Sequence, residues 1–370
     1  MFTPPFNRII EELPASTPFV GPETLERRSG TPFALRLGAN ESPFGMSPAA
    51  QSAMKTSLSV ISWYGDPEAY PLRSKLAALH HLSMEQVAIG SGIDEILGWI
   101  VRIFVQPGEP VVASLGGYPT FQYHVHSFGA RLELVPYRPD FSNDLPGLLQ
   151  AVEVTGAHLL YLANPDNPTG THLTPEALES FIQSLPADCM LILDEAYIDF
   201  VHPTQRLPMI HFHPQVIRLR TFSKVYGMAG ARVGYALALP EIVHAFDKIR
   251  NHFGVNRPAL AGALAALKDT EFVQGVRREN AVGRVDYEQM AQTHGIQTIP
   301  SHTNFVSFNL NSKDRAQALL HNLMKLGVFV RAPGGAPPLD QLLRITVGTP
   351  EQRQLLKPLF AQAIQTLSNC

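Results

Sequence analysis

Short apolar segments alternate with amphipathic helical patterns over residues 48–250 of this 370-residue chain. Several of the segments are apolar throughout, as in strands that are buried on both faces of a parallel sheet. Strands that alternate with helices indicate an α/β fold with a mainly parallel central sheet. The predicted strands are VAIG (87–90), EPVVAS (109–114), RLELVP (131–136), AHLLYLANP (157–165), CMLILDEAY (189–197), VIRLRTFSK (216–224) and VGYALA (233–238).

The pattern changes after Asn256. A long helical region is predicted over 258–294, followed by a strand (302–310), a helix (313–326), two short strands (327–331 and 342–348) and a final helix from Pro350. This succession predicts a smaller α+β domain over 256–370, beside a large domain over 48–255. Residues 1–47 form an arm that is too short to fold alone, and we expect it to pack on the smaller domain.

Composition narrows the range of partners. Charged residues make up 16% of the chain, below the usual ~25%, which suggests that surface is buried against another subunit. The net charge of −3 provides no basic field for nucleic acid or anionic lipid. No signal-like or membrane-spanning stretch is visible, and two cysteines form no disulfide framework. Histidine pairs such as His80 with His81 lack cysteine or carboxylate partners in register, so no metal site is expected. These features favour a cytoplasmic protein.

Polar residues follow the predicted strands where ligands bind in such sheets, beyond the carboxyl ends. Gly90-Ser91-Gly92 leads into a helix whose first N–H groups could hold a phosphate, although a plain turn is the alternative. Asp194 ends one strand, where helix capping is the alternative. Lys224 follows a buried strand, and a lysine desolvated beside a cation becomes a nucleophile for carbonyls.

These pieces together suit pyridoxal phosphate, which needs a lysine for its aldehyde, a carboxylate for its ring nitrogen and an anion cradle for its phosphate. Lys224 and Asp194 meet the first two needs, and Gly92, Thr221 and Arg232 meet the third. Further expected contacts are Ser223 to the phosphate, Asn167 and Tyr197 to the phenolate oxygen, and Tyr118 stacked on the ring face.

The ordered motifs resemble the fold-type I pyridoxal-phosphate aminotransferases, and within them the histidinol-phosphate aminotransferases. The resemblance covers nearly the whole chain. It is carried by LGANESPFG (37–45), YGDP (64–67), GSGIDE (90–95), NPDNPTG (164–170), DEAYIDF (194–200), TFSKVYGMAGARVGY (221–235), PSHTNF (300–305) and LLRITVGT (342–349).

The resemblance implies a role for each matching residue. Lys224 would form the Schiff base with the cofactor, and Asp194 would pair with the ring nitrogen. Tyr64 matches a tyrosine that reaches the cofactor phosphate of the neighbouring subunit, so a homodimer with sites at its interface is implied. The other implied contacts are Asn167 and Tyr197 at the phenolate oxygen, Ser223, Arg232 and the backbone of Gly92, Ile93 and Asp94 at the phosphate, Tyr118 on the ring, and Asn40, Arg331 and Arg344 at the substrate.

The implied reaction transfers the amino group of L-histidinol phosphate to 2-oxoglutarate, giving imidazole-acetol phosphate and L-glutamate by a ping-pong cycle. Lys224, once displaced, would act as the general base. The chain departs from the pattern at 250–256, where Phe253 stands in place of a common tyrosine; we expect this segment between the domains, near the substrate. An aromatic amino acid aminotransferase, a threonine-phosphate decarboxylase and a cofactor-binding regulatory module remain as alternatives.

Overall fold

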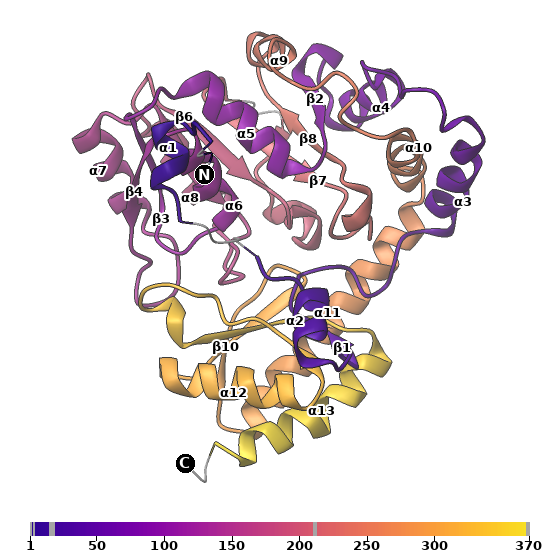
Figure 1. Cartoon of the computed structure of the whole chain (residues 1–370), viewed down its shortest axis with the longest axis vertical. Coiled ribbons are helices and arrows are strands. Elements are labelled where there is room, and N and C mark those ends of the chain that lie inside the picture. Colours follow the sequence, from indigo (N-terminus) through magenta and orange to yellow (C-terminus); the bar gives the residue numbers. More distant parts are fainter. Residues whose placement is uncertain (1, 3, 15–18, 210–212, 368–370) are drawn as a thin grey trace.

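A computed structural model describes residues 2, 4–14, 19–209 and 213–367, and its helices and strands form two packed units (Figure 1). The larger unit is built on a seven-stranded sheet in the order β2-β8-β7-β6-β5-β3-β4. Only β8 runs antiparallel to its neighbours, so the predicted mainly parallel sheet and α/β class are confirmed. The strands are β2 (Val87–Gly90), β3 (Pro110–Ser114), β4 (Arg131–Val135), β5 (Leu159–Ala163), β6 (Met190–Asp194), β7 (Val216–Thr221) and β8 (Gly234–Leu237).

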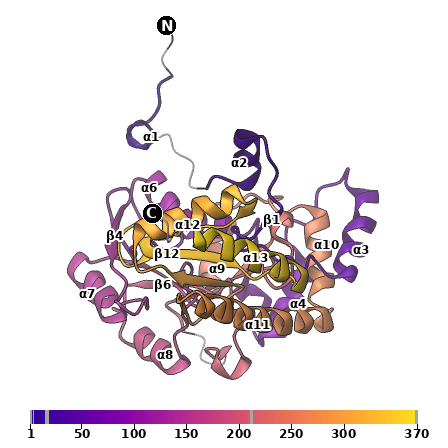
Figure 2. The ribbon, with the colours of Figure 1, turned by 90° about the horizontal axis from the view of Figure 1, so that it is seen from below.

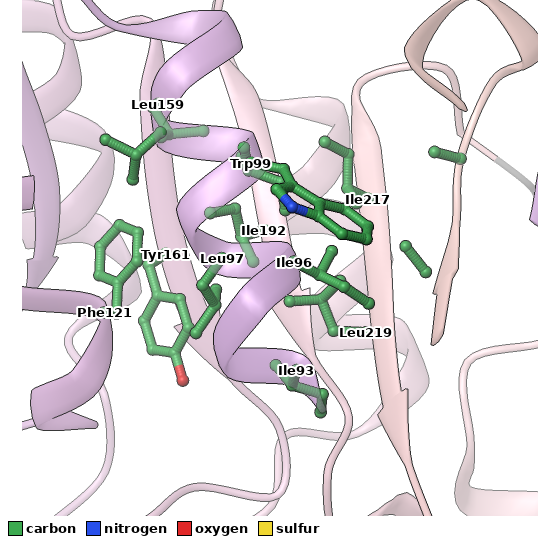
Figure 3. Packing of buried hydrophobic residues seen from close by; sticks show 14 of the residues in the cluster. Ile93, Ile96, Leu97, Trp99, Phe121, Leu159, Tyr161, Ile192, Ile217 and Leu219 are labelled. Carbon is green, nitrogen blue, oxygen red and sulfur yellow. The ribbon is translucent and has the colours of Figure 1, made fainter. Parts of the chain in front are cut away.

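Helices cover both faces of this sheet because successive strand residues point to opposite sides. Leu159 and Tyr161 of β5 lie on the face covered by α5 (Ile93–Phe104), α6 (Pro119–Ser127) and α9 (Pro240–Asp247), and Figure 3 shows them beside side chains of α5 and α6. Leu160 and Leu162 pack toward α7 (Leu145–Thr155) and α8 (Pro175–Gln183). The result is a three-layer unit in which β5 and β7 are buried along their whole length.

The β2–β8 end of the sheet is covered by α3 (Pro48–Ser57), α4 (Tyr70–His80) and α10 (Arg257–Ala266). Ala259 and Ala263 of α10 are fully buried in this cluster, because small side chains let the helix approach α3 closely. α10 therefore packs on the large unit, whereas the sequence predicted that the smaller domain begins at residue 256.

The smaller unit has its own core. Its antiparallel sheet, in the order β12-β10-β9, packs against three helices. The elements are β9 (Gln297–Ile299), β10 (Phe305–Asn309), β11 (Val328–Phe329), β12 (Leu342–Thr346), α11 (Thr270–Thr293), α12 (Lys313–Lys325) and α13 (Pro350–Gln365). Among the described residues, the short 3₁₀ helices are η1 (Leu58–Val60), η2 (Met84–Gln86), η3 (Ile198–Phe200), η4 (Pro203–Gln205), η6 (Ala229–Ala231) and η7 (Leu339–Gln341).

The N-terminal arm contacts both units. β1 (Leu35–Arg36) pairs in parallel with β11 of the smaller unit, and α2 (Pro22–Ser29) lies beside it, tied by ion pairs from Arg36 to Glu23 and Glu26. Ile9 in α1 (Arg8–Glu12) instead lies beside Gly129 of the large unit, and Figure 2 shows the arm extending beyond the rest of the chain. Residues 1, 3 and 15–18 of the predicted arm lie outside the described residues.

Within the described ranges, no helix combines the length and the apolar character that crossing a bilayer requires.

His80 gives the fold a pH dependence. It is buried at the end of α4, with Nε2 3.0 Å from the Tyr235 hydroxyl, and burial lowers its pKa to about 3. The unfolded pKa is about 6.5, so this contribution to stability is complete above pH 6.5 and declines as the pH falls toward 3. Between pH 6.5 and 5 we expect a loss of about 2 kcal/mol.

This prediction is checked by urea unfolding of wild type and His80→Gln between pH 7 and 5. The variant should lose less stability over this range. His244→Gln, at an exposed position, should behave as wild type. An unchanged acid slope in His80→Gln would show that His80 does not titrate as argued.

Candidate active site

The candidate site lies where β2, β6 and β7 end, as expected for the carboxyl edge of a parallel sheet. Gly92 precedes α5, two residues after β2. Asp194 is the last residue of β6, and Thr221 is the last residue of β7. Lys224 follows Thr221 by three residues in a tight turn, where the Gly227 N–H bonds the Lys224 carbonyl.

Asp194 is held in a dry environment. Its carboxylate accepts hydrogen bonds from the Tyr161 hydroxyl (2.7 Å) and the Ala196 N–H (3.0 Å). Burial raises the pKa of this carboxyl to about 6, and the nearby charge of Lys224 opposes the rise. A cation placed against Asp194 would favour the carboxylate form, so the environment suits a protonated ring nitrogen.

Lys224 and Tyr197 both form hydrogen bonds with Asn40. Lys224 Nζ donates to the Asn40 carbonyl at 3.0 Å and lies 5.4 Å from the centre of the Tyr197 ring. The Tyr197 hydroxyl accepts a hydrogen bond from Asn40 Nδ2 at 2.9 Å. The lysine is half-buried, while Asn40 and Tyr197 are buried. Three of the residues that the sequence predicts for the site are thus in contact.

The predicted phosphate cradle forms at the N-terminus of α5. Gly92 has φ +83°, and a Cβ built there would lie 2.5 Å from Arg232 Nη2, so only glycine lets the arginine approach. Arg232 Nη2 pairs with Asp94 Oδ2 at 3.1 Å, and Tyr118 donates to Asp94 Oδ1 at 2.7 Å. At this helix N-terminus the first N–H groups, beginning with that of Ile93, have no intrahelical acceptor.

Two buried hydroxyls lie at the end of β7, on Thr221 and Ser223. Thr221 Oγ1 donates to Ser223 Oγ at 2.9 Å and accepts from the Ser223 N–H at 3.0 Å. A small pocket borders the same region and is lined by Tyr118, Tyr161 and Asp166 among others.

Arg344 lies on β12, and Arg331 follows β11 by two residues; the two exchange both backbone hydrogen bonds in an isolated antiparallel bridge. Arg344 Nη1 donates to Asn167 Oδ1, which links it to the loop after β5. Burial lowers the pKa of Arg344, and burial together with the Arg344 charge lowers that of Arg331 to about 10. Among the described residues neither guanidinium has a carboxylate partner, and both Nε atoms are buried without an acceptor.

Phe19 of the arm lies over Arg331. The guanidinium carbon is 3.9 Å from the Phe19 ring centre and 5.6 Å from that of Phe329, and Arg331 Nη2 donates to the Val20 carbonyl at 2.9 Å. Such stacking fixes the plane of an arginine without neutralising its charge.

Tyr64 does not join the site within this chain. Its side chain is exposed and stacks on Phe253, with ring centroids 4.5 Å apart. Arg257 Nη2 donates to the Tyr64 carbonyl and so fixes the backbone there.

The 250–256 segment contacts the large unit at the 64–67 turn. Phe253 packs on Tyr64, Arg250 Nη1 donates to the Pro67 carbonyl at 3.0 Å, and Asn256 caps α10. The cause is local: the cap and the Arg250 contact hold the segment against the 64–67 turn.

Sequence reasoning missed Tyr161, Asn304, Thr346 and Phe19. Tyr161 interrupts an otherwise aliphatic strand, and its position one strand from Asp194 is a usable signal. Asn304 and Thr346 stand inside recognised motifs without an assigned role, because their partner, Asn40, is hundreds of residues away in sequence. Phe19 has no sequence signal.

The residues fit pyridoxal phosphate. The carboxyl of Asp194, the amine of Lys224 and the N-terminus of α5 beside Arg232 lie around one region, and a buried carboxylate such as Asp194 favours a cationic partner. Gly92 and Gly234 leave that cradle open, since a Cβ on either would collide with Arg232 or with the Ile93 backbone. Asp194, Tyr197, Asn167 and Lys224 would hold the ring, while Ser223, Thr221, Arg232 and the α5 N-terminus would hold the phosphate.

Comparison with known proteins gives a consistent result. The profile of the family described as aminotransferase class I and II matches residues 34–356. A histidinol-phosphate aminotransferase of Bacillus pumilus is 34% identical over 334 residues, 90% of each chain. The crystal structure of histidinol-phosphate aminotransferase from Sinorhizobium meliloti in complex with pyridoxal-5′-phosphate superposes with a TM-score of 0.95, at 43% identity over 99% of both chains. An aspartate aminotransferase of Thermus thermophilus shares the fold, with a TM-score of 0.83 at 21% identity over 98% of this chain and 100% of that one.

Proposed function

Because this chain belongs to the class I and II aminotransferase family, we propose that it transfers the amino group of L-histidinol phosphate to 2-oxoglutarate. The protein is a pyridoxal-phosphate-dependent aminotransferase. The proposed products are imidazole-acetol phosphate and L-glutamate, formed in a ping-pong cycle in which both substrates use one site.

The pair Arg331 and Arg344 carries the proposal for the substrates. Among the described residues, neither of these adjacent guanidinium groups has a carboxylate partner, and each has a buried Nε without a hydrogen-bond acceptor. Such a pair is suited to a doubly charged or phosphorylated anion. Histidinol phosphate offers a phosphate, and 2-oxoglutarate offers two carboxylates, so the same pair can serve both half-reactions.

The chain's own groups divide the work of the reaction. Bound pyridoxal phosphate supplies an aldehyde that condenses with amines and a ring that withdraws electrons from the attached substrate. Lys224 provides the amine for covalent attachment and, when displaced, moves the proton at the substrate Cα. Asp194 keeps the ring nitrogen protonated, and Asn167 and Tyr197 orient the phenolate oxygen. Arg344 orients the substrate through its anionic group.

Absorbance spectroscopy tests the proposed donor. Purified protein loaded with cofactor receives L-histidinol phosphate, phenylalanine or threonine phosphate separately, without an oxo acid. Histidinol phosphate at low concentration should convert the yellow form to the colourless pyridoxamine form. Conversion by phenylalanine alone would identify an aromatic amino acid aminotransferase, and loss of carboxylate from threonine phosphate would identify a decarboxylase.

Replacement of Arg344 by alanine is expected to weaken both substrates together, because they share its anion site. The loss of a charge-assisted contact worth about 1.5–3 kcal/mol predicts a roughly 10–100-fold fall in kcat/KM for each substrate. Steady-state kinetics with varied histidinol phosphate and varied 2-oxoglutarate provide the measurement. Arg315→Ala, on the exposed face of α12, is the matched control. A loss confined to one substrate would indicate separate anion sites.

A homodimer is part of the proposal. Large apolar side chains are exposed together around the start of the large unit, where a single chain leaves them in water. Arg257 and Phe253 hold Tyr64 in a fixed, outward position, as a residue that completes a partner's phosphate site would need. The exposed side chains are Leu58, Ile61, Trp63, Tyr64, Tyr70 and Phe253.

The proposed compartment is the cytoplasm. The chain carries two cysteines, and burial raises the pKa of the Cys189 thiol to about 12, so this thiol is unreactive. A protein without a disulfide framework is typical of a reducing compartment.

A further inference from the structure

Asn40 has a backbone conformation that its surroundings must maintain. Its φ of +54° lies in the left-handed region, and the residue is 2% exposed. Asparagine adopts this region more readily than most residues, yet a relaxed chain prefers negative φ. A buried residue in this conformation is kept there by contacts on several sides.

Two residues of the smaller unit provide these contacts. The Thr346 hydroxyl, at the end of β12, accepts from the Asn40 N–H at 3.1 Å and donates to Asn40 Oδ1 at 3.3 Å. Asn304, just before β10, donates from Nδ2 to the Asn40 carbonyl at 3.0 Å and to the Glu41 carbonyl at 3.2 Å. Backbone and side chain of Asn40 are therefore both held from the same sheet.

The orientation of Asn304 follows from this geometry. Its Nδ2 faces two carbonyl acceptors, while its Oδ1 is buried without a partner. A buried unpaired acceptor has a free-energy cost, and the amide cannot reverse without opposing its oxygen to two carbonyls. The function of this side chain therefore lies in its N–H groups and the carbonyls that they hold.

Asn40 in turn contacts two residues of the large unit, Lys224 and Tyr197. The carbonyl that Asn304 holds is the acceptor of Lys224 Nζ, and the Asn40 side-chain amide donates to the Tyr197 hydroxyl. Two donors, one from each unit, thus converge on a single oxygen. Displacement of this oxygen would release the Lys224 amine.

We infer that Asn304 and Thr346 are positioning residues for Lys224, acting through the Asn40 carbonyl. The described hydrogen bonds of their side chains go to Asn40 and Glu41 rather than to Lys224, and they set where the amine lies before the cofactor binds. The inference rests on the proposed role of Lys224 as the attachment site, and it adds that the smaller unit controls the position of this amine.

The test measures the reactivity of the Lys224 amine in the cofactor-free protein. Wild type and variants are treated briefly with an amine-acylating reagent, and labelling of Lys224 relative to exposed Lys248 is quantified by peptide mass spectrometry. Asn304→Ala and Thr346→Val should each increase relative labelling of Lys224 by about tenfold, the factor that corresponds to losing one hydrogen bond to a charged group.

The chain offers closely matched controls. Asn280 is also buried, also donates from Nδ2 to one backbone carbonyl, that of Thr303 at 2.9 Å, and also has an unpaired Oδ1. Asn280→Ala should lose comparable stability and leave Lys224 labelling at the wild-type level. Thr346→Ser keeps the hydroxyl and should also keep wild-type labelling.

Each outcome is decisive. Increased labelling in Asn304→Ala and Thr346→Val, but in neither control, supports the inference. Equal increases in Asn280→Ala would indicate general loosening and overturn it, as would unchanged labelling in both test variants. If Asn304→Ala does not fold, the pair Thr346→Val and Thr346→Ser decides. Borohydride trapping of the cofactor on wild-type Lys224 is a separate readout, whose failure would refute the proposed function.

Discussion

Alanine at position 224 is expected to abolish covalent attachment of the cofactor and to slow conversion of bound cofactor by histidinol phosphate by at least about 10²–10⁴-fold. The variant loses both the amine that condenses with the aldehyde and the base that moves the Cα proton. The half-buried side chain of Lys224 has the Asn40 carbonyl and the Tyr197 ring as its described partners, so the fold should persist without it. Single-turnover absorbance measurements give the rate, and mass spectrometry after borohydride reduction gives the attachment.

Lys248→Ala provides the control, since this lysine is exposed at the end of α9. It should retain wild-type rates and attachment. A Lys224→Ala protein that still carries a reduced, lysine-linked cofactor would refute the assignment of the attachment site. Partial recovery of the rate by small added amines would identify the lost group as the base.

Mixing subunits extends this prediction to the proposed dimer. Lys224→Ala and Tyr64→Ala proteins are each expected to be impaired. In a mixed dimer one site receives Lys224 from one chain and Tyr64 from the other. Random exchange should therefore restore about a quarter of the sites, because half of the dimers are mixed and each has one intact site. Absence of any recovery after demonstrated exchange would place Tyr64 outside the partner's site.

Loss of the Glu195 carboxylate is expected to destabilise the protein by about 3–5 kcal/mol. Glu195 is 2% exposed and accepts from Arg218 (2.6 and 3.0 Å) and from Arg220 (2.8 Å), both also buried. Glu195→Ala leaves two buried cations without their partner. Urea unfolding of wild type and variant at pH 7 measures the difference.

Acid should reproduce part of this loss. Burial alone would raise the pKa of Glu195, but Arg218 and Arg220 lower it to about 2. The folded pKa is below the unfolded value of about 4.5, so the contribution is complete above pH 4.5 and is lost as the pH falls toward 2.

Two variants test the Glu195 explanation. Glu12→Ala breaks the Arg8–Glu12 pair, in which both side chains are exposed, and should leave the urea midpoint at the wild-type value because water screens such a pair. Replacing Glu195, Arg218 and Arg220 together by methionine should cost less than Glu195→Ala, because no buried charge is then unpaired. A triple variant that is less stable than the single one would contradict this account.

The fold could be predicted largely from the strand pattern. All seven predicted strands of the large unit exist, and VAIG coincides with β2 residue for residue. Several of them, such as β2 and β5, were recognisable because strands buried on both faces are apolar throughout. The positions of Asp194 and Lys224 followed from the rule that polar groups gather at the carboxyl ends of strands.

Features that depend on tertiary contact could not be predicted. α10 follows the predicted boundary at 255 yet packs on α3, since alanines at helical spacing show that a helix is buried but not against which partner. The contact of the 250–256 segment with the 64–67 turn has no local signature in the sequence either. The role of Asn304 and Thr346 follows from their hydrogen bonds to Asn40, which is distant in sequence.

The contacts of Asn40 also determine when the site can form during synthesis. Its partners Lys224, Asn304 and Thr346 lie 184, 264 and 306 residues further along the chain. All strands of the large sheet end by residue 237, so a nascent chain can pack that sheet while Asn40 still lacks two of its anchors. Only when the ribosome has released the segment around Thr346 can the Lys224 amine take its final place, which makes this site one of the last parts of the enzyme to be completed.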